Sequence, residues 1–179
     1  MKTPLLEAVN ITVSFPLRRG LLGNVVESVK ALDNVSLGVV EGEVLGIVGE
    51  SGSGKTTLAR CLVGLVKPDL GRVLYMGNDI FMLRGALYKK FRREVQMVFQ
   101  NPYTSLNPTM KVKDIIKDVL KASGNWDTGG EGLVKELLKA VGLGGDILYK
   151  YPSELSGGQA QRVAIARALA TKPKIIILD

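Results

Sequence analysis

The stretch VLGIVGESGSGKTTLARCLVGL, residues 44–65, decides the fold of this chain. It opens with a short apolar run at 44–48, continues through a glycine-rich turn at 49–54 and ends in a segment whose apolar residues recur at helical spacing. That order predicts a strand, a loop and a helix. The loop also matches the pattern G-x-x-x-x-G-K-[ST], whose defined positions hold Gly49, Gly54, Lys55 and Thr56.

The residue types in this loop suit the binding of phosphate groups. Its glycines let the backbone bend tightly and approach a ligand without a Cβ clash. Successive backbone N–H groups can then surround an anion at the positive end of the following helix. Lys55 would reach the β- and γ-phosphates, and the Thr56 hydroxyl would ligate Mg²⁺. The alternative is a glycine-rich turn that binds nothing. We predict a nucleotide-phosphate site made by Gly49, Ser51, Gly52, Ser53, Gly54, Lys55, Thr56 and Thr57.

Composition limits the class of protein. With 179 residues, 46% of them hydrophobic, the chain is long enough for one well-buried domain. Its apolar runs are far shorter than a membrane span needs, and its start does not resemble a secretory signal. The single cysteine, Cys61, is expected in the core and suits a reducing cytosol. The net charge of +7 is scattered, with a denser run at 84–93 that we interpret as a solvated helix face; no nucleic-acid partner is expected.

Periodicity predicts the remaining elements. Alternating residues ahead of the glycine-rich loop indicate two strands joined by a surface loop at 16–24, and short Asn/Gly turns favour an antiparallel arrangement. Three helical segments late in the chain would form a small lobe inserted between strands, with their apolar stripes as its core. The predicted strands are 5–15, 29–39, 72–76, 94–99 and 174–179, and the predicted helical segments besides the first are 83–94, 111–122, 130–142 and 146–150.

Three further stretches carry polar residues at the ends of predicted elements. Gln100 ends an apolar strand and opens a loop with two prolines, where ligands are met in α/β folds. The sequence LSGGQ at 155–159 precedes an alanine-rich helix, so that its N–H groups and the Ser156 hydroxyl are exposed; an N-capping serine is the alternative. Asp179 follows a continuous apolar run that we expect to be a buried parallel strand. P-loop enzymes hold Mg²⁺ with an aspartate at the C-terminal end of such a strand.

Taken together, these motifs resemble the ATP-binding subunit of ABC transporters. GESGSGKT resembles the Walker A motif, Gln100 the Q-loop, LSGGQ the signature motif and IIILD the Walker B motif, all in the family's order. The resemblance implies an α/β fold, a P-loop NTPase (RecA-like) core with an N-terminal antiparallel β piece and an inserted helical lobe. It also implies a division into 1–99 (nucleotide-binding core), 100–155 (helical lobe) and 156–179 (signature helix and Walker B strand).

A narrower resemblance concerns the transported solute. The loop FQNPYTSLNP at 99–108, and the basic, glycine-containing insertion after Phe15, resemble the oligopeptide/dipeptide importer branch. The resemblance therefore implies that the subunit energises import of di- or oligopeptides. The same branch includes importers of nickel and other small solutes, which remain an alternative.

The resemblance implies roles for single residues, with ATP and Mg²⁺ as cofactors. Lys55, Gln100 and Asp179 would be catalytic, and Mg²⁺ would be held by Thr56, Gln100 and Asp179. Phe15 would stack on adenine, although a strand-end core phenylalanine is the alternative. A second ATP-binding subunit would join head to tail, so that the signature motif faces the γ-phosphate of the partner's ATP. The residues that would do so are Ser156, Gly157, Gly158 and Gln159.

The implied assembly places this subunit on the cytoplasmic face of the cell membrane, as a peripheral partner of two transmembrane permease subunits. An external solute-binding protein would act on it indirectly. A non-transport ABC ATPase of DNA repair or translation is disfavoured, because the lobe between Gln100 and Leu155 is short and lacks heptads. A degenerate nucleotide-sensing subunit is a third possibility, against which the intact Lys55, Ser156 and Asp179 argue.

One departure from the family's pattern lies at the end of the sequence. The family's catalytic glutamate directly follows the Walker B aspartate, and its switch histidine lies further on; this sequence stops at Asp179 and contains no histidine. We therefore expect an incomplete fold at the C-terminus, a piece of a longer subunit. That piece is expected to bind nucleotide without competent hydrolysis, because the general base is missing.

Overall fold

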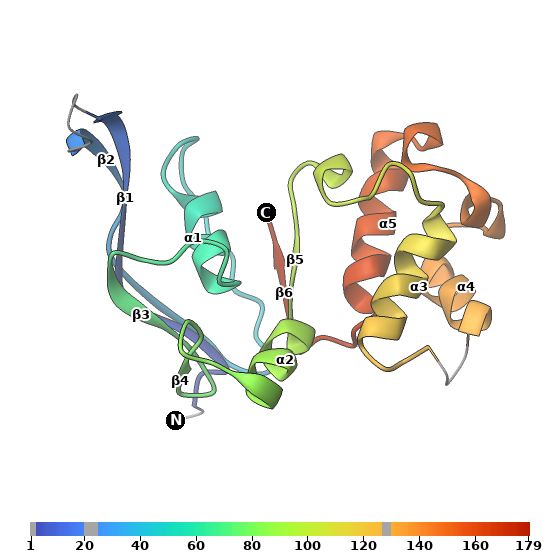
Figure 1. The fold of residues 1–179 in the computed structure, drawn as a ribbon, viewed down its shortest axis with the longest axis horizontal. Helices are drawn as coiled ribbons and strands as arrows, with labels where there is room; N and C mark the ends of the chain where they lie inside the picture. The colour runs from blue at the N-terminus through green and yellow to red at the C-terminus, as the bar shows by residue number, and fades with distance from the viewer. Residues whose placement is uncertain (1–2, 20–24, 127–129) are drawn as a thin grey trace. The chain divides into compact units, whose positions relative to one another are not determined.

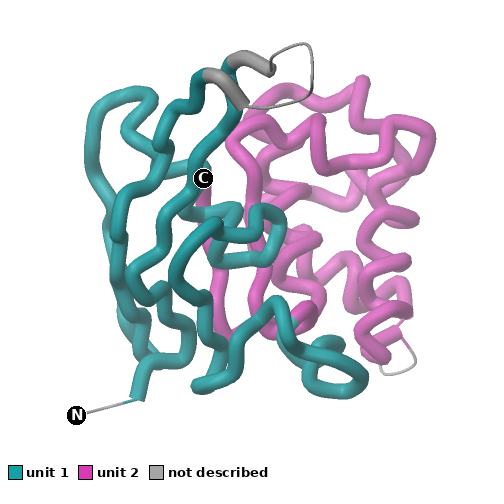
Figure 2. Tube along the Cα trace, turned by 60° about the vertical axis from the view of Figure 1, so that its left-hand side comes forward, with its two compact units in different colours: residues 1–91 teal, residues 92–179 magenta. Residues whose placement is uncertain are grey.

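The structure, a computed structural model, describes residues 3–19, 25–126 and 130–179. The chain divides into two units, Met1–Phe91 and Arg92–Asp179 (Figure 2). The glycine-rich loop belongs to the first unit, whereas Gln100, Ser156 and Asp179 belong to the second. The predicted division at residues 99/100 and 155/156 follows the motifs and stays a prediction.

The first unit contains a four-stranded antiparallel sheet in the order β2-β1-β3-β4 (Figure 1). This confirms the predicted antiparallel piece. The predicted surface loop at 16–24 is wrong in its first part, because β1 continues through 16–19, paired with β2 through shifts of register; residues 20–24 lie outside the described residues. The strands are β1 (Leu6–Arg19), β2 (Val25–Val39), β3 (Leu70–Tyr75) and β4 (Asn78–Asp79).

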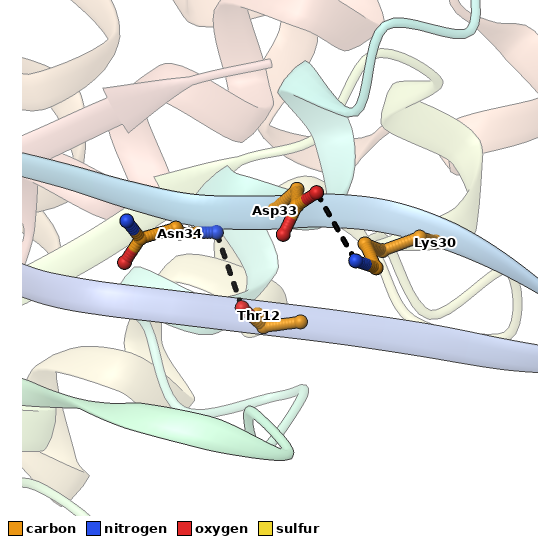
Figure 3. Close-up of polar contacts among 4 residues, drawn as sticks. All are labelled: Thr12, Lys30, Asp33 and Asn34. Carbon is orange, nitrogen blue, oxygen red and sulfur yellow. Dashed lines mark hydrogen bonds and ion pairs between the residues drawn. The ribbon is translucent and has the colours of Figure 1, made fainter.

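The β1–β2 ribbon changes register around two asparagines. Asn10 and Asn34 have φ angles of 49° and 52°, in the left-handed region that asparagine tolerates better than most residues. Side chains on the opposite strand satisfy their backbone N–H groups. Thr12 Oγ1 accepts from Asn34 at 3.1 Å (Figure 3), and Ser36 Oγ accepts from Asn10 at 2.8 Å. Such bulges bend a ribbon and increase its twist.

Helix α1 (Lys55–Leu62) packs against the β1–β2 ribbon. Its buried face includes Leu58 and Leu62 together with Cys61, which is fully buried as predicted. Further along, α2 (Gly85–Glu94) begins in the same unit and places Phe91 against Tyr75, with ring centroids 5.4 Å apart. Its basic side chains are largely exposed, as expected of a solvated face.

The predicted strand at 44–48 is wrong. The turn at 41–43 forms, but residues 44–48 are assigned to no strand and pair with none in the described part of the chain. Val44 and Val48 are 99% and 98% exposed. The physical reason is that an apolar run becomes a strand only where a neighbouring strand accepts its hydrogen bonds, and pairing is set by the tertiary fold rather than by the run itself.

The second unit combines a parallel strand pair with a helical lobe. β5 (Val95–Val98) and β6 (Ile175–Leu178) are in register from Val95–Ile175 to Val98–Leu178. Three helices pack pairwise around a shared apolar core (Figure 1). They are α3 (Val112–Ala122), α4 (Gly130–Ala140) and α5 (Gly157–Leu169). The 3-10 turn η1 (Pro102–Thr104) precedes α3, and the 3-10 turns η2 (Gly145–Tyr149) and η3 (Pro152–Glu154) lie between α4 and α5.

Two expectations for this unit need correction. The helical segment predicted at 146–150 is a 3-10 turn, because only five residues separate Gly144 from Lys150. The last strand is parallel, as predicted, but it is not buried throughout: Ile175 is buried, whereas Leu178 is 71% exposed. Within the described ranges, none of the helices has the length and apolar character that crossing a bilayer requires.

Candidate functional site

The glycine-rich loop turns directly into α1 through backbone that only glycine adopts easily. Gly52 and Gly54 have φ angles of 81° and 93°, in the left-handed region. Gly54 is the N-cap of α1, and a Cβ there would overlap the carbonyl oxygen of Ala31 on β2. The sequence pattern therefore has a structural cause: close packing on the ribbon requires glycine at this position.

The N-terminus of α1 lacks two groups that commonly stabilise a helix start, an N-cap side chain and an acidic residue in the first turn. Gly54 makes no side-chain cap, and the first turn of α1 contains no acidic residue. Helix N-termini otherwise recruit such groups, because their first N–H groups lack intrahelical partners and the helix dipole is positive there. This end of α1 is thus electrostatically suited to an anion.

The Lys55 ammonium lies inside the loop that precedes it. Its Nζ donates to the carbonyl oxygens of Gly49 at 2.8 Å and Glu50 at 2.6 Å, and to Ser53 Oγ at 3.2 Å. The loop itself is closed by a hydrogen bond of 3.2 Å from the Ser53 N–H to the Glu50 carbonyl. The positive charge of Lys55 is therefore held at the N-terminus of α1, where Gly54 supplies no capping side chain.

The other predicted loop residues lie around this lysine. Ser51 is exposed in the turn, and Thr56 and Thr57 follow Lys55 in the first turn of α1, both half-buried. Phe15 lies within β1 rather than at its end and is 44% exposed, so the core alternative does not describe it. Stacking of Phe15 on adenine stays a prediction.

In the second unit, Gln100 and Asp179 leave the same edge of a sheet. Gln100 is exposed in a bend two residues after β5, and Asp179 directly follows β6. The Asp179 N–H donates to the Val98 carbonyl at 3.0 Å, extending the parallel pair by one hydrogen bond. The carboxyl ends of neighbouring parallel strands are where α/β folds place ligand-binding groups.

Ser156 caps α5, which agrees with the structural alternative for that residue. Its Oγ accepts from the Gln159 N–H at 3.3 Å, and its own N–H donates to Gln159 Oε1 at 3.0 Å, forming a capping box. A Cβ added to Gly157 or Gly158 would meet nothing within 4 Å. Packing against the described residues therefore does not require glycine at these two positions.

Within the described ranges, no cluster of three or more His, Cys, Asp or Glu residues is arranged to hold a metal ion. Mg²⁺ does not require such a cluster, since it keeps several waters and takes one or two protein oxygens together with substrate phosphates. The hydroxyl of Thr56, the amide of Gln100 and the carboxylate of Asp179 are oxygen donors of that kind. The donor set fits Mg²⁺ chemically.

Sequence reasoning missed two contacts that join the loop after Gln100 to α5. Tyr103 Oη donates to the Leu155 carbonyl at 3.0 Å, and Arg167 donates to the Ser105 carbonyl. Burial lowers the pKa of the Arg167 guanidinium. The sequence did contain a signal, because Arg167 recurs at helical spacing with the buried Val163 and Ala164 and so interrupts an apolar stripe.

Comparisons with known proteins agree with this geometry. The family profile described as "ABC transporter" matches residues 32–179. The dipeptide transport ATP-binding protein DppF of Lactococcus lactis subsp. cremoris (strain MG1363) is 49% identical over 154 residues, covering 84% of this chain and 49% of that protein. The oligopeptide transport ATP-binding protein OppF of Streptococcus mutans serotype c (strain ATCC 700610 / UA159) is 46% identical over 178 residues, 98% of this chain and 56% of that protein.

Solved structures give the same result for the fold. A dimeric, post-hydrolysis structure of the ATP-binding cassette MJ0796 with ADP and Pi has a TM-score of 0.80 and 32% identity, covering 97% of this chain and 73% of that one. The chain spans about half the length of the curated relatives it matches. The predicted α/β fold of a P-loop NTPase is thereby confirmed. With a family match over most of its residues, the chain belongs to the ABC transporter family.

Proposed function

We propose that the whole protein binds and hydrolyses ATP to energise the import of di- or oligopeptides through a pair of membrane permease subunits. The observation that carries the proposal is the Lys55 ammonium, held by its own loop at the N-terminus of α1. Similarity to dipeptide and oligopeptide transport ATP-binding proteins supports the choice of solute.

In this proposal the loop at 49–57 binds the ATP phosphates. Phosphate oxygens carry more negative charge than the carbonyl oxygens of Gly49 and Glu50, so they compete well for the Lys55 ammonium. The positive end of the α1 helix dipole adds a second source of positive potential. Phe15, with its exposed ring, would cover the adenine base.

Three residues would hold Mg²⁺, namely Thr56, Gln100 and Asp179. The ion, when bound, neutralises the charge that develops on the transferred phosphoryl group. Gln100 and Asp179 suit this task because they leave one edge of the β5–β6 pair. Gln100 would also orient the attacking water.

A second ATP-binding subunit would complete the site. In a head-to-tail dimer, the start of α5 would face the γ-phosphate of the partner's ATP, with contacts from Ser156, Gly157, Gly158 and Gln159. None of the described residues lies close enough to Gly157 or Gly158 to require glycine there, which supports a role in approaching a ligand closely. The dimeric state of the MJ0796 cassette is consistent with such an arrangement.

The test is transport by the full-length protein reconstituted with its permease pair in vesicles. We expect ATP-dependent uptake of a labelled di- or tripeptide, abolished by Lys55→Ala and competed by unlabelled peptides. Uptake or ATPase stimulation by Ni²⁺ with no response to peptides would contradict the peptide assignment. Equal ATP hydrolysis by wild type and Lys55→Ala would contradict the ATPase assignment.

A further inference from the structure

The hydroxyl of Tyr103 connects two segments that are 52 residues apart in the sequence. It donates a hydrogen bond of 3.0 Å to the carbonyl oxygen of Leu155. Leu155 directly precedes Ser156, the N-cap of α5, and Tyr103 lies three residues after Gln100. One side-chain hydrogen bond therefore joins the Gln100 loop to the start of the signature helix.

The turn that carries Tyr103 is closed by its own hydrogen bonds. The Asn101 side chain accepts from the Tyr103 N–H at 3.1 Å, and the Thr104 hydroxyl donates to the Asn101 carbonyl at 2.7 Å. Ser105 Oγ donates to the carbonyl of the buried Pro102 at 2.8 Å. These bonds hold residues 101–105 in one closed turn, which begins directly after Gln100.

A second contact joins the same turn to the other end of α5. Arg167, in the last turn of the helix, donates to the Ser105 carbonyl. Arg167 follows Ser156 by eleven positions, which corresponds to roughly 16 Å along a helix axis. Two attachments that far apart fix the orientation of α5 on the turn, not only its distance from it.

We propose that Tyr103 is a positioning residue that makes Gln100 and the N-terminus of α5 move as one body. The inference rests on the proposed function, in which Gln100 serves the subunit's own ATP and Ser156 serves the partner's ATP. A rigid connection between them couples the two nucleotide sites of the dimer, and such a coupling acts equally in both directions. The hydrogen bond from Tyr103 to Leu155 makes this connection at the N-terminus of α5, the end that would face the γ-phosphate of the partner's ATP.

The test uses Tyr103→Phe in the full-length protein, which removes the hydroxyl and keeps the ring. Tyr149→Phe is the matched control, because Tyr149 is also an exposed tyrosine of the helical lobe and its hydroxyl makes no hydrogen bond among the described residues. Three functional quantities are measured, together with thermal stability: affinity for ADP, steady-state ATP turnover, and hydrogen exchange at the amides of residues 156–160.

We expect Tyr103→Phe to lower turnover about two- to tenfold, the effect of losing one hydrogen bond from the assembled site, with ADP affinity within about twofold of wild type. Exchange at 156–160 should be faster, and Tyr149→Phe should match wild type in all three. Wild-type turnover in Tyr103→Phe would overturn the proposal. A matching fall in ADP affinity and thermal stability would also overturn it, because the role would then be structural. If wild type and Lys55→Ala hydrolyse ATP equally, the proposed function itself fails.

Discussion

Lys55 Nζ lies 2.6 Å from the carbonyl oxygen of Glu50, five residues earlier in the same loop. The hydrogen bond holds the side chain back over the loop instead of letting it extend into solvent. A charged donor that already points into a curled backbone needs little rearrangement to exchange a carbonyl acceptor for a phosphate oxygen, so little rotamer entropy is lost on binding. The acceptors that hold the Lys55 ammonium, on Gly49, Glu50 and Ser53, all come from the same loop.

Gly54→Ala tests whether packing on β2 dictates the loop. A side chain at position 54 would be strained by the left-handed φ of 93° and would also overlap the backbone carbonyl of Ala31. At Gly52 only the φ of 81° opposes a side chain, because no described atom lies within 4 Å of a Cβ there. We expect Gly54→Ala to lower the free energy of unfolding by about 2 to 5 kcal/mol and Gly52→Ala by about 1 to 2 kcal/mol. Urea unfolding measures both; equal losses would contradict the packing argument.

Ser156 has a capping role and a proposed phosphate role that substitutions can separate. Ser156→Ala removes the cap and should cost about 1 kcal/mol of stability, whereas Ser156→Asp keeps an acceptor for the Gln159 N–H. The added carboxylate would repel a phosphate, so Ser156→Asp should retain stability and lose ATP turnover. Ser153→Ala, at an exposed serine of η3, is the control and should change neither quantity. Normal turnover in Ser156→Asp would leave only the capping role.

Cys61 should make stability depend on pH in the alkaline range. Burial, with a smaller contribution from the Asp69 carboxylate, raises the pKa of the Cys61 thiol from 9.0 to about 11. The unfolded chain then loses this proton at lower pH than the folded chain, so the thiol's contribution is complete below pH 9 and declines as the pH rises toward 11. The loss is at most about 2 to 3 kcal/mol.

The measurement is urea unfolding at several pH values between 8 and 11, on wild type and Cys61→Ala. The alanine variant differs in packing at every pH, but its stability should fall less steeply above pH 9. Parallel curves for the two proteins would show that the thiol does not titrate differently in the folded state.

Periodicity predicted those parts of the fold that depend on local information. The apolar stripes of α3 and α4 place Ile116 and Leu120, and Val134 and Leu138, in one core, as their helical spacing indicated. The antiparallel β1–β2 pair likewise follows from alternation and turns. The full extent of β1 did not follow from the sequence. Pro16 and the basic residues after it indicate a loop, whereas pairing with β2 keeps residues 16–19 extended.

Pairing between distant segments could not be predicted in the same way. Residues 44–48 have the composition of a buried strand, yet Val44 and Val48 are exposed, since burial comes from neighbours and not from the run itself. The motif residues were placed correctly on a loop, on strand ends and on a helix start because fixed spacing identifies them. The Tyr103–Leu155 hydrogen bond could not be predicted, because no local sequence pattern indicates that two residues 52 positions apart are in contact.

The central claim is that the Lys55 loop binds the phosphates of ATP. Its most direct test is to measure equilibrium binding of Mg²⁺–ATP to wild type, Lys55→Ala and Lys67→Ala. Lys67 is an exposed lysine shortly after α1 and controls for the loss of one positive charge from the same unit. Charge-assisted hydrogen bonds are worth about 1.5 to 3 kcal/mol, so Lys55→Ala should bind at least about tenfold more weakly, with Lys67→Ala near wild type and all three equally folded by circular dichroism. An unchanged ATP affinity in Lys55→Ala would contradict the claim.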